Sequence, residues 1–316
     1  MDNIGIVTYP FISGLYYLAD SFKKIEEDKG NNVFLFPKKS FINKDGKWIS
    51  KIKYELDNFI HINENILYNI QLLTLVKKKN IKRIFSFETF MRDCSWVKTL
   101  RSNGVEVIDI PMPEWTNKID IYTGKYNIFS SVYCLTEQSY DVFRSYANAK
   151  KITWDFCNQQ PLVKTKNNIL TLYHPGSNSL NNQKNTESVI DAFSSIENND
   201  ISLIISGVHN RKITDKRIIH IGSNLSRQKI YDAYSISDCI VSPSSREGLG
   251  MCFYEAKKFG CDIITTDYDP MRQHSRYLCK VSGYEENDSP IPFAIVSPSA
   301  IADQINKYYE DFYATK

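Results

Sequence analysis

The chain has 316 residues, of which 42% are hydrophobic and 13% aromatic, and this is enough apolar material for two domain-sized cores. Its 39 basic and 36 acidic residues leave a formal net charge of +3, so no overall electrostatic field attracts it to nucleic acid. Seven cysteines without the spacing of a zinc site, no apolar run of membrane-spanning length and no basic-then-apolar leader predict a cytoplasmic protein with reduced thiols.

The first half of the sequence alternates strand and helix patterns. Apolar strands at 3–9 and 31–36 enclose a helix at 15–30, and such a βαβ unit predicts a parallel sheet. A hairpin or excursion is expected around Asp45 and Gly46. The remaining patterns are helices at 64–79 and 95–104 and strands at 81–88, 105–110 and 126–136. This alternation is typical of an α/β layered domain.

The second half repeats this rhythm without repeating the sequence. The expected elements are strands at 168–176, 201–207, 217–222, 238–244 and 261–267, and helices at 184–197, 226–237 and 299–316. Between the halves lies a polar stretch that contains Pro161 and lacks periodicity. We therefore expect a first domain at 1–155, a linker at 156–168, a second domain at 169–299 and a terminal helix at 300–316.

The most informative stretch follows the strand "DCIV" and reads "SPSSREGLGMCFYEAKKFG", residues 242–260. In a parallel α/β sheet, ligands bind beyond the carboxyl ends of the strands, where loops lead into helices. Gly248 and Gly250 allow a ligand to approach the backbone, and the amides at the following helix start suit a diphosphate. Glu247, before the helix, and Glu255, inside it, can accept hydrogen bonds from sugar and ribose hydroxyls.

This stretch resembles the proline-serine, E-x7-E, alanine and glycine signature of the retaining GT-B glycosyltransferases of family GT4. The resemblance continues upstream through "IIHIGSNLSRQKIYDAYSISDCIVSPS" and "QKNTESVIDAF", and more weakly in "ISGLYYLADSFKKIEEDKGNNVFLF" near the start. It implies a GT-B fold, in which two Rossmann-like domains face each other across a cleft. The nucleotide sugar would bind to the second domain and the acceptor to the first, and the terminal helix could cross back to the first domain.

Carried over by position, the resemblance assigns catalytic roles to two residues. Glu247 would contact the donor sugar, and Lys184 would neutralise the diphosphate. Glu255 would hold the ribose. The residues assigned to donor binding are Glu255, Gly248, Leu249, Gly250, Met251, Gly14, Ser223, Asn224 and Leu225. The resemblance also implies that no metal or other cofactor is needed: the departing phosphate oxygen would itself take the acceptor proton, and Lys184 would stabilise its charge.

The sequence departs from the family pattern in the cationic partner of Lys184. Ser179 stands where the family usually has an arginine. Arg211, Arg227 or Arg246 would have to replace that arginine if two cations are needed, and the sequence leaves this choice open.

Three other features have weaker interpretations. The "DYD" at 267–269 imitates an Asp-x-Asp metal motif, but short matches of this kind are common, so we expect no metal there. Glu88 follows a strand of the first domain and is equally well explained as an acceptor-side residue or as a solvated one. The basic run Lys77–Lys79 suits the end of a helix and leaves attachment to a membrane surface open.

We therefore predict a retaining, metal-independent hexosyltransferase. It would move a hexose from a nucleoside diphosphate sugar, GDP-mannose or UDP-glucose, to a glycan or other glycosylated acceptor. Two alternatives stay open: a catalytically silent nucleotide-sugar binding protein, and an inverting GT-B relative such as a UDP-sugar epimerase. The base, the hexose, the acceptor and the oligomeric state are not determined by the sequence, and fold similarity alone does not decide them.

Overall fold

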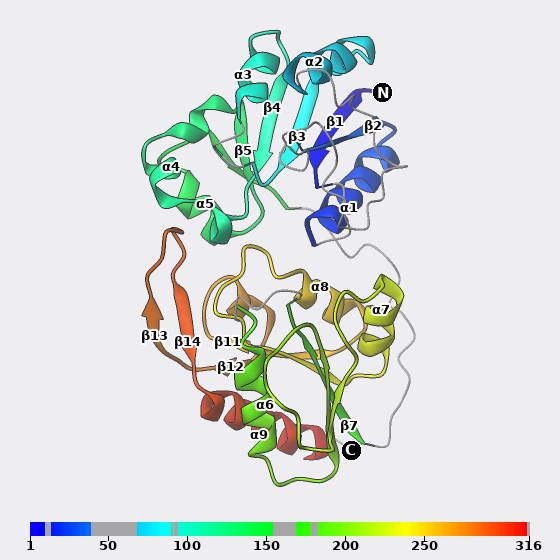
Figure 1. Ribbon diagram of the computed structural model, residues 1–316, viewed down its shortest axis with the longest axis vertical. Helices are drawn as coiled ribbons and strands as arrows, with labels where there is room; N and C mark the ends of the chain where they lie inside the picture. The colour runs from blue at the N-terminus through cyan, green and yellow to red at the C-terminus, as the bar shows by residue number, and fades with distance from the viewer. Residues whose placement is uncertain are drawn as a thin grey trace. The chain divides into compact units, whose positions relative to one another are not determined.

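The computed structural model describes residues 1–9, 14–38, 68–89, 91, 94–153, 169–177 and 183–314. The chain forms two compact units. Unit 1 comprises Met1–Phe156 with Asp288–Pro290, and unit 2 comprises Cys157–Asn287 with Ile291–Lys316. Figure 1 colours the chain from blue at the start of unit 1 to red at the end of unit 2. The hairpin expected around Asp45 and the linker expected at 156–168 lie outside the described residues.

Unit 1 is a parallel α/β sandwich. In chain order its elements are β1 (Asn3–Thr8), α1 (Gly14–Asp28), β2 (Asn32–Pro37), α2 (Tyr68–Lys78), β3 (Arg83–Phe87), α3 (Ser95–Arg101), β4 (Glu106–Ile110), the 3-10 turn η4 (Pro113–Trp115), α4 (Lys118–Tyr122), the 3-10 turn η5 (Lys125–Ile128), β5 (Ser131–Cys134), α5 (Glu137–Phe143) and β6 (Ala149–Lys151). The strands form one parallel sheet in the order β2-β1-β3-β4-β5-β6. Because the strand order reverses direction at β1, the switch point lies between β1 and β3.

Helices cover both faces of the unit 1 sheet. Leu72 of α2 and Leu100 of α3 join Val107 of β4 in one buried cluster. On the opposite face α1 contributes Phe22, whose ring centroid lies 4.6 Å from that of Phe85 in β3. Burial on both faces explains why these strands read as almost continuous apolar runs.

Unit 2 is a second sandwich of the same type. Its elements are β7 (Leu170–Pro175), α6 (Thr186–Ser194), β8 (Ile201–Ser206), β9 (Ile218–His220), α7 (Arg227–Ser235), β10 (Cys239–Ser242), α8 (Met251–Lys258), β11 (Asp262–Thr266), the 3-10 turn η6 (Met271–His274), β12 (Tyr277–Cys279), β13 (Val281–Glu285), β14 (Phe293–Val296) and α9 (Pro298–Ala314). Six strands form a parallel sheet in the order β12-β11-β10-β7-β8-β9, and β13 and β14 form an antiparallel hairpin. The switch point of this sheet lies between β7 and β10.

The terminal helix α9 belongs to the core of unit 2. Ile301 and Ile305 are fully buried in the same cluster as Phe193 of α6, and α6 and α9 lie against each other (Figure 1). The Tyr308 hydroxyl donates to the Asp262 carboxylate at 3.1 Å. The expectation that this helix could cross back to the first domain was therefore wrong, because its apolar stripe is already used within unit 2.

The predicted strands and helices are present wherever the structure describes them, apart from one strand. The stretch predicted as a strand at 126–136 is a 3-10 turn followed by the shorter strand β5. Gly124 has a left-handed φ of 71°, and the Tyr126 ring packs 5.8 Å from the Phe129 ring, a spacing of three residues that suits a helical turn. The short elements α4, α5, β6 and β12 and the β13–β14 hairpin were not predicted.

We expect that replacing Ile305 by alanine destabilises unit 2 selectively. The side chain is fully buried between α9 and the sheet, so the cavity should cost about 2–5 kcal/mol of unfolding free energy. Chemical denaturation measures the loss, and hydrogen exchange shows in which unit protection falls. Glu310→Ala, on the exposed face of the same helix, is the matched control and should change the unfolding free energy by less than about 0.5 kcal/mol. Equal loss of protection in unit 1 would contradict the assignment of α9.

Candidate functional site in unit 2

The candidate site lies at the carboxyl edge of the unit 2 sheet, around the switch point between β7 and β10. The loop before α6 follows β7, and residues 243–250 follow β10 and lead into α8. Open parallel α/β sheets bind their ligands in the crevice at the switch point of the strand order. All of residues 241–250 are buried, so the loop is held by the protein and not by solvent.

Hydrogen bonds hold the two loops together. Asn185 donates its side-chain amide to the Pro243 carbonyl at 2.7 Å, and Gln183 donates to the Arg246 carbonyl at 2.9 Å. In return the Ser245 amide donates to the Gln183 carbonyl at 2.8 Å. The site is therefore built from segments about 60 residues apart in the chain, and the polar side chains are used to satisfy buried backbone carbonyls.

His174 fixes the base of the site. It is fully buried at the end of β7, and its Nδ1 lies 2.7 Å from the Val241 carbonyl oxygen of β10, which can only accept. Nδ1 therefore carries the proton, and Nε2 accepts from the Thr186 hydroxyl at 2.9 Å, at the start of α6. Burial lowers the pKa of His174 to about 4, so the ring is neutral and joins two strands and a helix.

Gly250 sets the turn into α8. Its φ of 73° is in the left-handed region, and a Cβ atom there would lie 2.4 Å from the ring of Phe253. Any other residue would be strained and would push this buried ring out of the core. Gly250 thus allows the glutamate loop to end directly in the first turn of α8, which begins at Met251. Gly248 and Leu249 lie in the same buried loop.

Lys184 and Glu247 form an ion pair across the site. The lysine Nζ donates to Glu247 Oε1. Their side chains are 21% and 9% exposed, so the pair is mostly shielded from water but can still be reached. The two residues predicted to be catalytic are thus brought together, although 63 positions separate them. The pairing offers a cation and a carboxylate side by side, as a charged donor with sugar hydroxyls would require.

Glu255 lies in the second turn of α8 with partners from α7. Tyr234 donates its hydroxyl to Glu255 Oε2 at 3.1 Å, and the Arg227 guanidinium lies 3.5 Å from Oε1. Burial raises the pKa of Glu255, and the charge of Arg227 opposes this rise. Sequence reasoning missed Tyr234, because an aromatic residue on a helix face is indistinguishable from an ordinary core residue.

The remaining predicted donor residues have different environments. Ser223 and Asn224 are exposed in the loop after β9, where Asn224 has a φ of 51°, and Leu225 is half-buried beside them. This loop is open to a ligand. Gly14 belongs to unit 1, at the exposed start of α1, and a Cβ there would meet no other atom. Its proposed approach to the phosphates stays a prediction.

The three arginines considered as replacements for the missing family arginine are engaged differently. Arg211 pairs with Asp191 of α6 at 2.6 Å. Arg246 is buried, stacks 3.9 Å over the Phe293 ring and donates to the Ile291 carbonyl. Arg227 lies 3.5 Å from the carboxylate of Glu255, a predicted donor residue. Ser179 itself lies outside the described residues.

Two further glycines shape the edge of the site and were not singled out from the sequence. A Cβ on Gly176, after β7, would lie 2.2 Å from the Ser206 carbonyl oxygen. Gly207, after β8, has a φ of 94°, and its Cβ would lie 2.5 Å from the Ser177 carbonyl oxygen. The two loops therefore touch backbone to backbone. The available signal was a glycine at the end of each of two predicted strand segments, 168–176 and 201–207.

No metal centre is formed by the residues that the structure describes. They contain no group of three or more histidine, cysteine, aspartate or glutamate side chains that could hold an ion. Asp267 and Asp269 of the "DYD" stretch instead face Arg272, at 3.5 and 4.0 Å.

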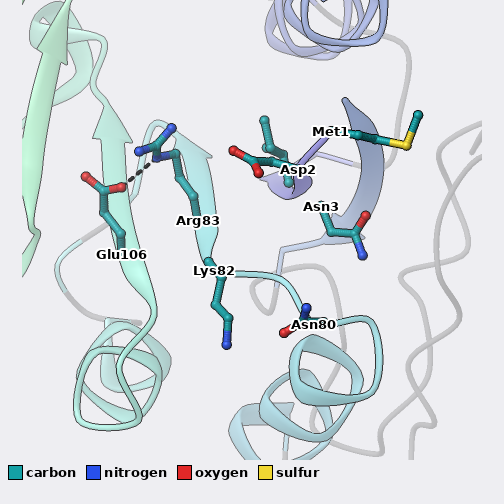
Figure 2. Close-up of a pocket in the computed structure, with 8 residues that line it drawn as sticks. Met1, Asp2, Asn3, Asn80, Lys82, Arg83 and Glu106 are labelled. Carbon is teal, nitrogen blue, oxygen red and sulfur yellow. Dashed lines mark hydrogen bonds and ion pairs between the residues drawn. The ribbon is translucent and has the colours of Figure 1, made fainter. Parts of the chain in front are cut away.

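Unit 1 contains a hollow of about 230 Å³ at the amino ends of β1, β3 and β4 (Figure 2). Figure 2 shows Arg83 turned toward Glu106, with which it forms an ion pair of 2.5 Å. Ligands of open parallel sheets bind at the opposite, carboxyl edge. Arg83 and Glu106 neutralise each other, and the hollow lies at the amino edge, so we do not include it in the functional site.

Two parallel α/β sandwiches in succession define the class of the fold, that of the GT-B glycosyltransferases. Residues 158–277 match the family described as glycosyl transferases group 1. The matched region contains Lys184, Glu247 and Glu255, with the loop at 223–225. A search of curated proteins found no match.

Solved structures resemble the chain over nearly its whole length. Anabaena Alr3699/HepE in complex with UDP and glucose is similar with a TM-score of 0.66 and 14% identity, covering 99% of this chain and 91% of that one. The pneumococcal O-GlcNAc transferase GtfA in complex with UDP and GlcNAc gives 0.65 and 11%, covering 98% and 92%. The lipopolysaccharide outer core galactosyltransferase WaaB gives 0.59 and 13%, covering 97% and 88%. At these identities the likeness concerns the fold.

We expect the stability of unit 2 to fall as the pH decreases from about 6.5 to about 4. His174 stays neutral in the folded state down to about pH 4, whereas in the unfolded chain it takes up a proton below pH 6.5. Its contribution to the unfolding free energy, about 3 kcal/mol, is therefore complete above pH 6.5 and is lost as the pH falls to about 4. Burial lowers the pKa of His274 to about 4 as well, which adds to the same window. Urea unfolding at a series of pH values measures the slope.

His174→Gln should reduce this slope, because it removes a group whose pKa is lowered by burial in the folded state. Lys229→Gln, at an exposed position of α7, is the control and should leave the slope as it is. An unchanged slope in His174→Gln would contradict the assignment of a buried neutral ring.

Proposed function

We propose that the protein is a glycosyltransferase that uses a nucleoside diphosphate hexose. The observation that carries the proposal is the Lys184–Glu247 pair, held at the carboxyl edge of the unit 2 sheet inside the region that matches glycosyl transferases group 1. The GT-B fold supports it independently.

The geometry suggests how the donor is bound. Lys184 and the backbone amides at the start of α8 would face the diphosphate, and Glu247 would accept hydrogen bonds from the hexose hydroxyls. In the absence of donor these two side chains neutralise each other. Donor binding would therefore exchange one charge partner for another, since the phosphate takes the lysine and the sugar hydroxyls take the carboxylate.

Glu255 would bind the two ribose hydroxyls. Its orientation is fixed by Tyr234 and Arg227, so the carboxylate oxygens are set before the ligand arrives. Arg227 lies close enough to Glu255 to serve as the second cation of the site, which the sequence lacks at Ser179. The exposed loop at 223–225 is the proposed contact for the base.

We propose retention of the anomeric configuration without a metal ion. Lys184 would neutralise the charge that develops on the leaving phosphate, and the departing oxygen would take the acceptor proton on the same face. This part of the proposal rests on the resemblance to family GT4. The products would be the nucleoside diphosphate and a glycoside with the donor's anomeric configuration.

The proposed donors are UDP-glucose and GDP-mannose. UDP-hexoses are to be tested first, because two structures of similar fold hold UDP together with glucose or GlcNAc. The proposed acceptor is a glycan or glycosylated molecule, and the proposed location is the cytoplasm. Among the residues that the structure describes, no helix combines the length and the apolar character needed to span a bilayer.

A second candidate is a protein that binds a nucleotide sugar without transferring it. Ser179 stands in the place of the family arginine, and Lys184 is already neutralised by Glu247, so the positive charge for the diphosphate is small. Turnover distinguishes this candidate from a transferase. The anomeric configuration of the product distinguishes a retaining enzyme from an inverting relative.

We expect Glu255→Gln to weaken donor binding roughly tenfold or more, because a charged acceptor of two ribose hydroxyls is replaced by a neutral one. Isothermal calorimetry with UDP-glucose, UDP-GlcNAc and GDP-mannose, without divalent metal, measures the affinity. Glu310→Gln, on the exposed face of α9, is the control of equal charge change. Equal affinity of both variants would remove Glu255 from the donor site.

Lys184→Met should reduce kcat by about 100-fold or more, since the developing phosphate charge loses its stabilising cation. Release of the nucleoside diphosphate from the donor identified by calorimetry gives the rate. Lys229→Met, at an exposed position of α7, should behave as the wild type. If KM rises while kcat stays constant, Lys184 contributes to ground-state binding only.

A further inference from the structure

A polar cluster is buried at the carboxyl edge of the unit 1 sheet, beside its own switch point. Tyr9 follows β1, Lys38 follows β2, Glu88 follows β3 and Asp109 lies in β4. Each of these four side chains is less than a tenth exposed. Charged groups are rarely buried without a partner or a function, and this is the edge where such sheets bind ligands.

The backbone at Glu88 is strained and held from several sides. Its φ of 55° is in the left-handed region, which a glutamate seldom adopts. The Glu88 amide donates to the Ile110 carbonyl at 2.9 Å, and the Lys38 ammonium donates to the Glu88 backbone carbonyl. The next amide, of Thr89, donates to Asp109 Oδ1 at 3.2 Å. Strain that the surroundings maintain in this way is typical of functional sites.

Asp109 supplies an independent observation. Its side chain is fully buried, and Oδ2 has no hydrogen-bond partner although Oδ1 accepts from Thr89. An unsatisfied buried carboxyl oxygen is costly, so such atoms usually mark a bound water or ligand. Burial raises the pKa of this carboxyl above its ordinary value, and the neighbouring Glu88 carboxyl raises it further.

Glu88 is the carboxylate that a ligand can reach. It keeps 7% exposure, whereas Asp109 has none. The Tyr9 hydroxyl donates to it, and the Lys38 ammonium lies 4.1 Å over the Tyr9 ring. One hydroxyl uses only part of the acceptor capacity of a carboxylate, so further hydrogen-bond donors can be accepted.

The charges select the type of ligand. The Lys38 ammonium is already engaged by the Glu88 carbonyl and the Tyr9 ring, and two carboxyl groups lie beside it, so the cluster offers little positive charge to a phosphate or another anion. A divalent metal would compete with the Lys38 ammonium, and the described residues offer no set of three ligand side chains. Hydroxyl groups of a neutral sugar fit this arrangement, because they donate to carboxylates without bringing charge into a buried site.

We propose that Glu88 binds hydroxyl groups of a neutral sugar at the carboxyl edge of unit 1, with Asp109 as a positioning residue that holds the strained turn through Thr89. The identification of this sugar as the acceptor of glycosyl transfer rests on the proposed function. The sugar site itself involves residues of unit 1 alone and can be tested without any donor.

The test measures binding of the methyl α- and β-glycosides of glucose, galactose, mannose and N-acetylglucosamine by saturation-transfer NMR, followed by titration. The wild type should bind at least one of them, and Glu88→Gln should weaken that binding about tenfold to a hundredfold. Glu106→Gln is the matched control, because it makes the same change in unit 1 at the amino end of β4. No binding by the folded wild type, or equal binding by both variants, would overturn the proposal.

Asp109 is tested by comparing two substitutions. Asp109→Asn keeps an oxygen that can accept from the Thr89 amide and should retain affinity within about threefold, whereas Asp109→Ala should lose about tenfold or more. Similar affinities of the two variants would remove the positioning role. If Glu88→Gln does not fold, the amide resonance of Thr89 in the wild type decides: it should shift when the glycoside is added, and no shift would overturn the site.

The donor titrations of Glu255→Gln separate this proposal from the proposed function. Glycoside binding without donor binding would support the sugar site and oppose the transferase. Donor binding without glycoside binding would oppose the sugar site and leave the donor site in unit 2 supported.

Discussion

The hydrogen bonds between residues 183–185 and residues 243–246 are the interaction on which the candidate donor site depends. They tie the start of α6 to the loop after β10, and His174 joins both to the end of β7. Because the bonds satisfy carbonyls that are shielded from water, breaking one would leave a buried polar group unpaired. The loop that presents Glu247 is therefore a rigid part of the sheet edge, and the charged side chains are held before any ligand is bound.

The charges of both units are arranged by the same physical rule. In unit 2, Lys184 pairs with Glu247 and Arg227 lies near Glu255. In unit 1, the Lys38 ammonium donates to the Glu88 backbone carbonyl, and its charge opposes the rise that burial causes in the pKa of the Glu88 carboxyl. A buried carboxylate without a cation or a hydrogen-bond donor would be very costly, so each glutamate is accompanied by a partner. Such partners also tune the site, because a ligand must replace the contacts that it displaces. The affinity of each site is then a difference between two sets of similar interactions.

Much of the fold followed from local patterns. Apolar runs of strand length separated by amphipathic helices predicted two parallel α/β domains, since both faces of such sheets are buried. Short elements escaped prediction: the run around Tyr126 looked like a strand but forms a 3-10 turn, because its aromatic residues pack at a spacing of three. The packing partner of α9 was not predicted either, because an amphipathic stripe shows that a helix packs against the protein but not against which element.

For the site, the sequence by itself determined the residue types and their local spacing. The glycines and glutamates of residues 242–260 were predicted to lie at a strand-loop-helix junction, because an apolar strand pattern precedes them and a helical spacing follows. Only the tertiary structure decided which distant residues join them. Lys184 meets Glu247, and Glu88 lies beside Asp109 and Lys38, because parallel strands bring their carboxyl ends to one edge. Tyr234 meets Glu255 because α7 and α8 pack into the same buried cluster. Contacts of this kind depend on strand order, which local periodicity does not encode.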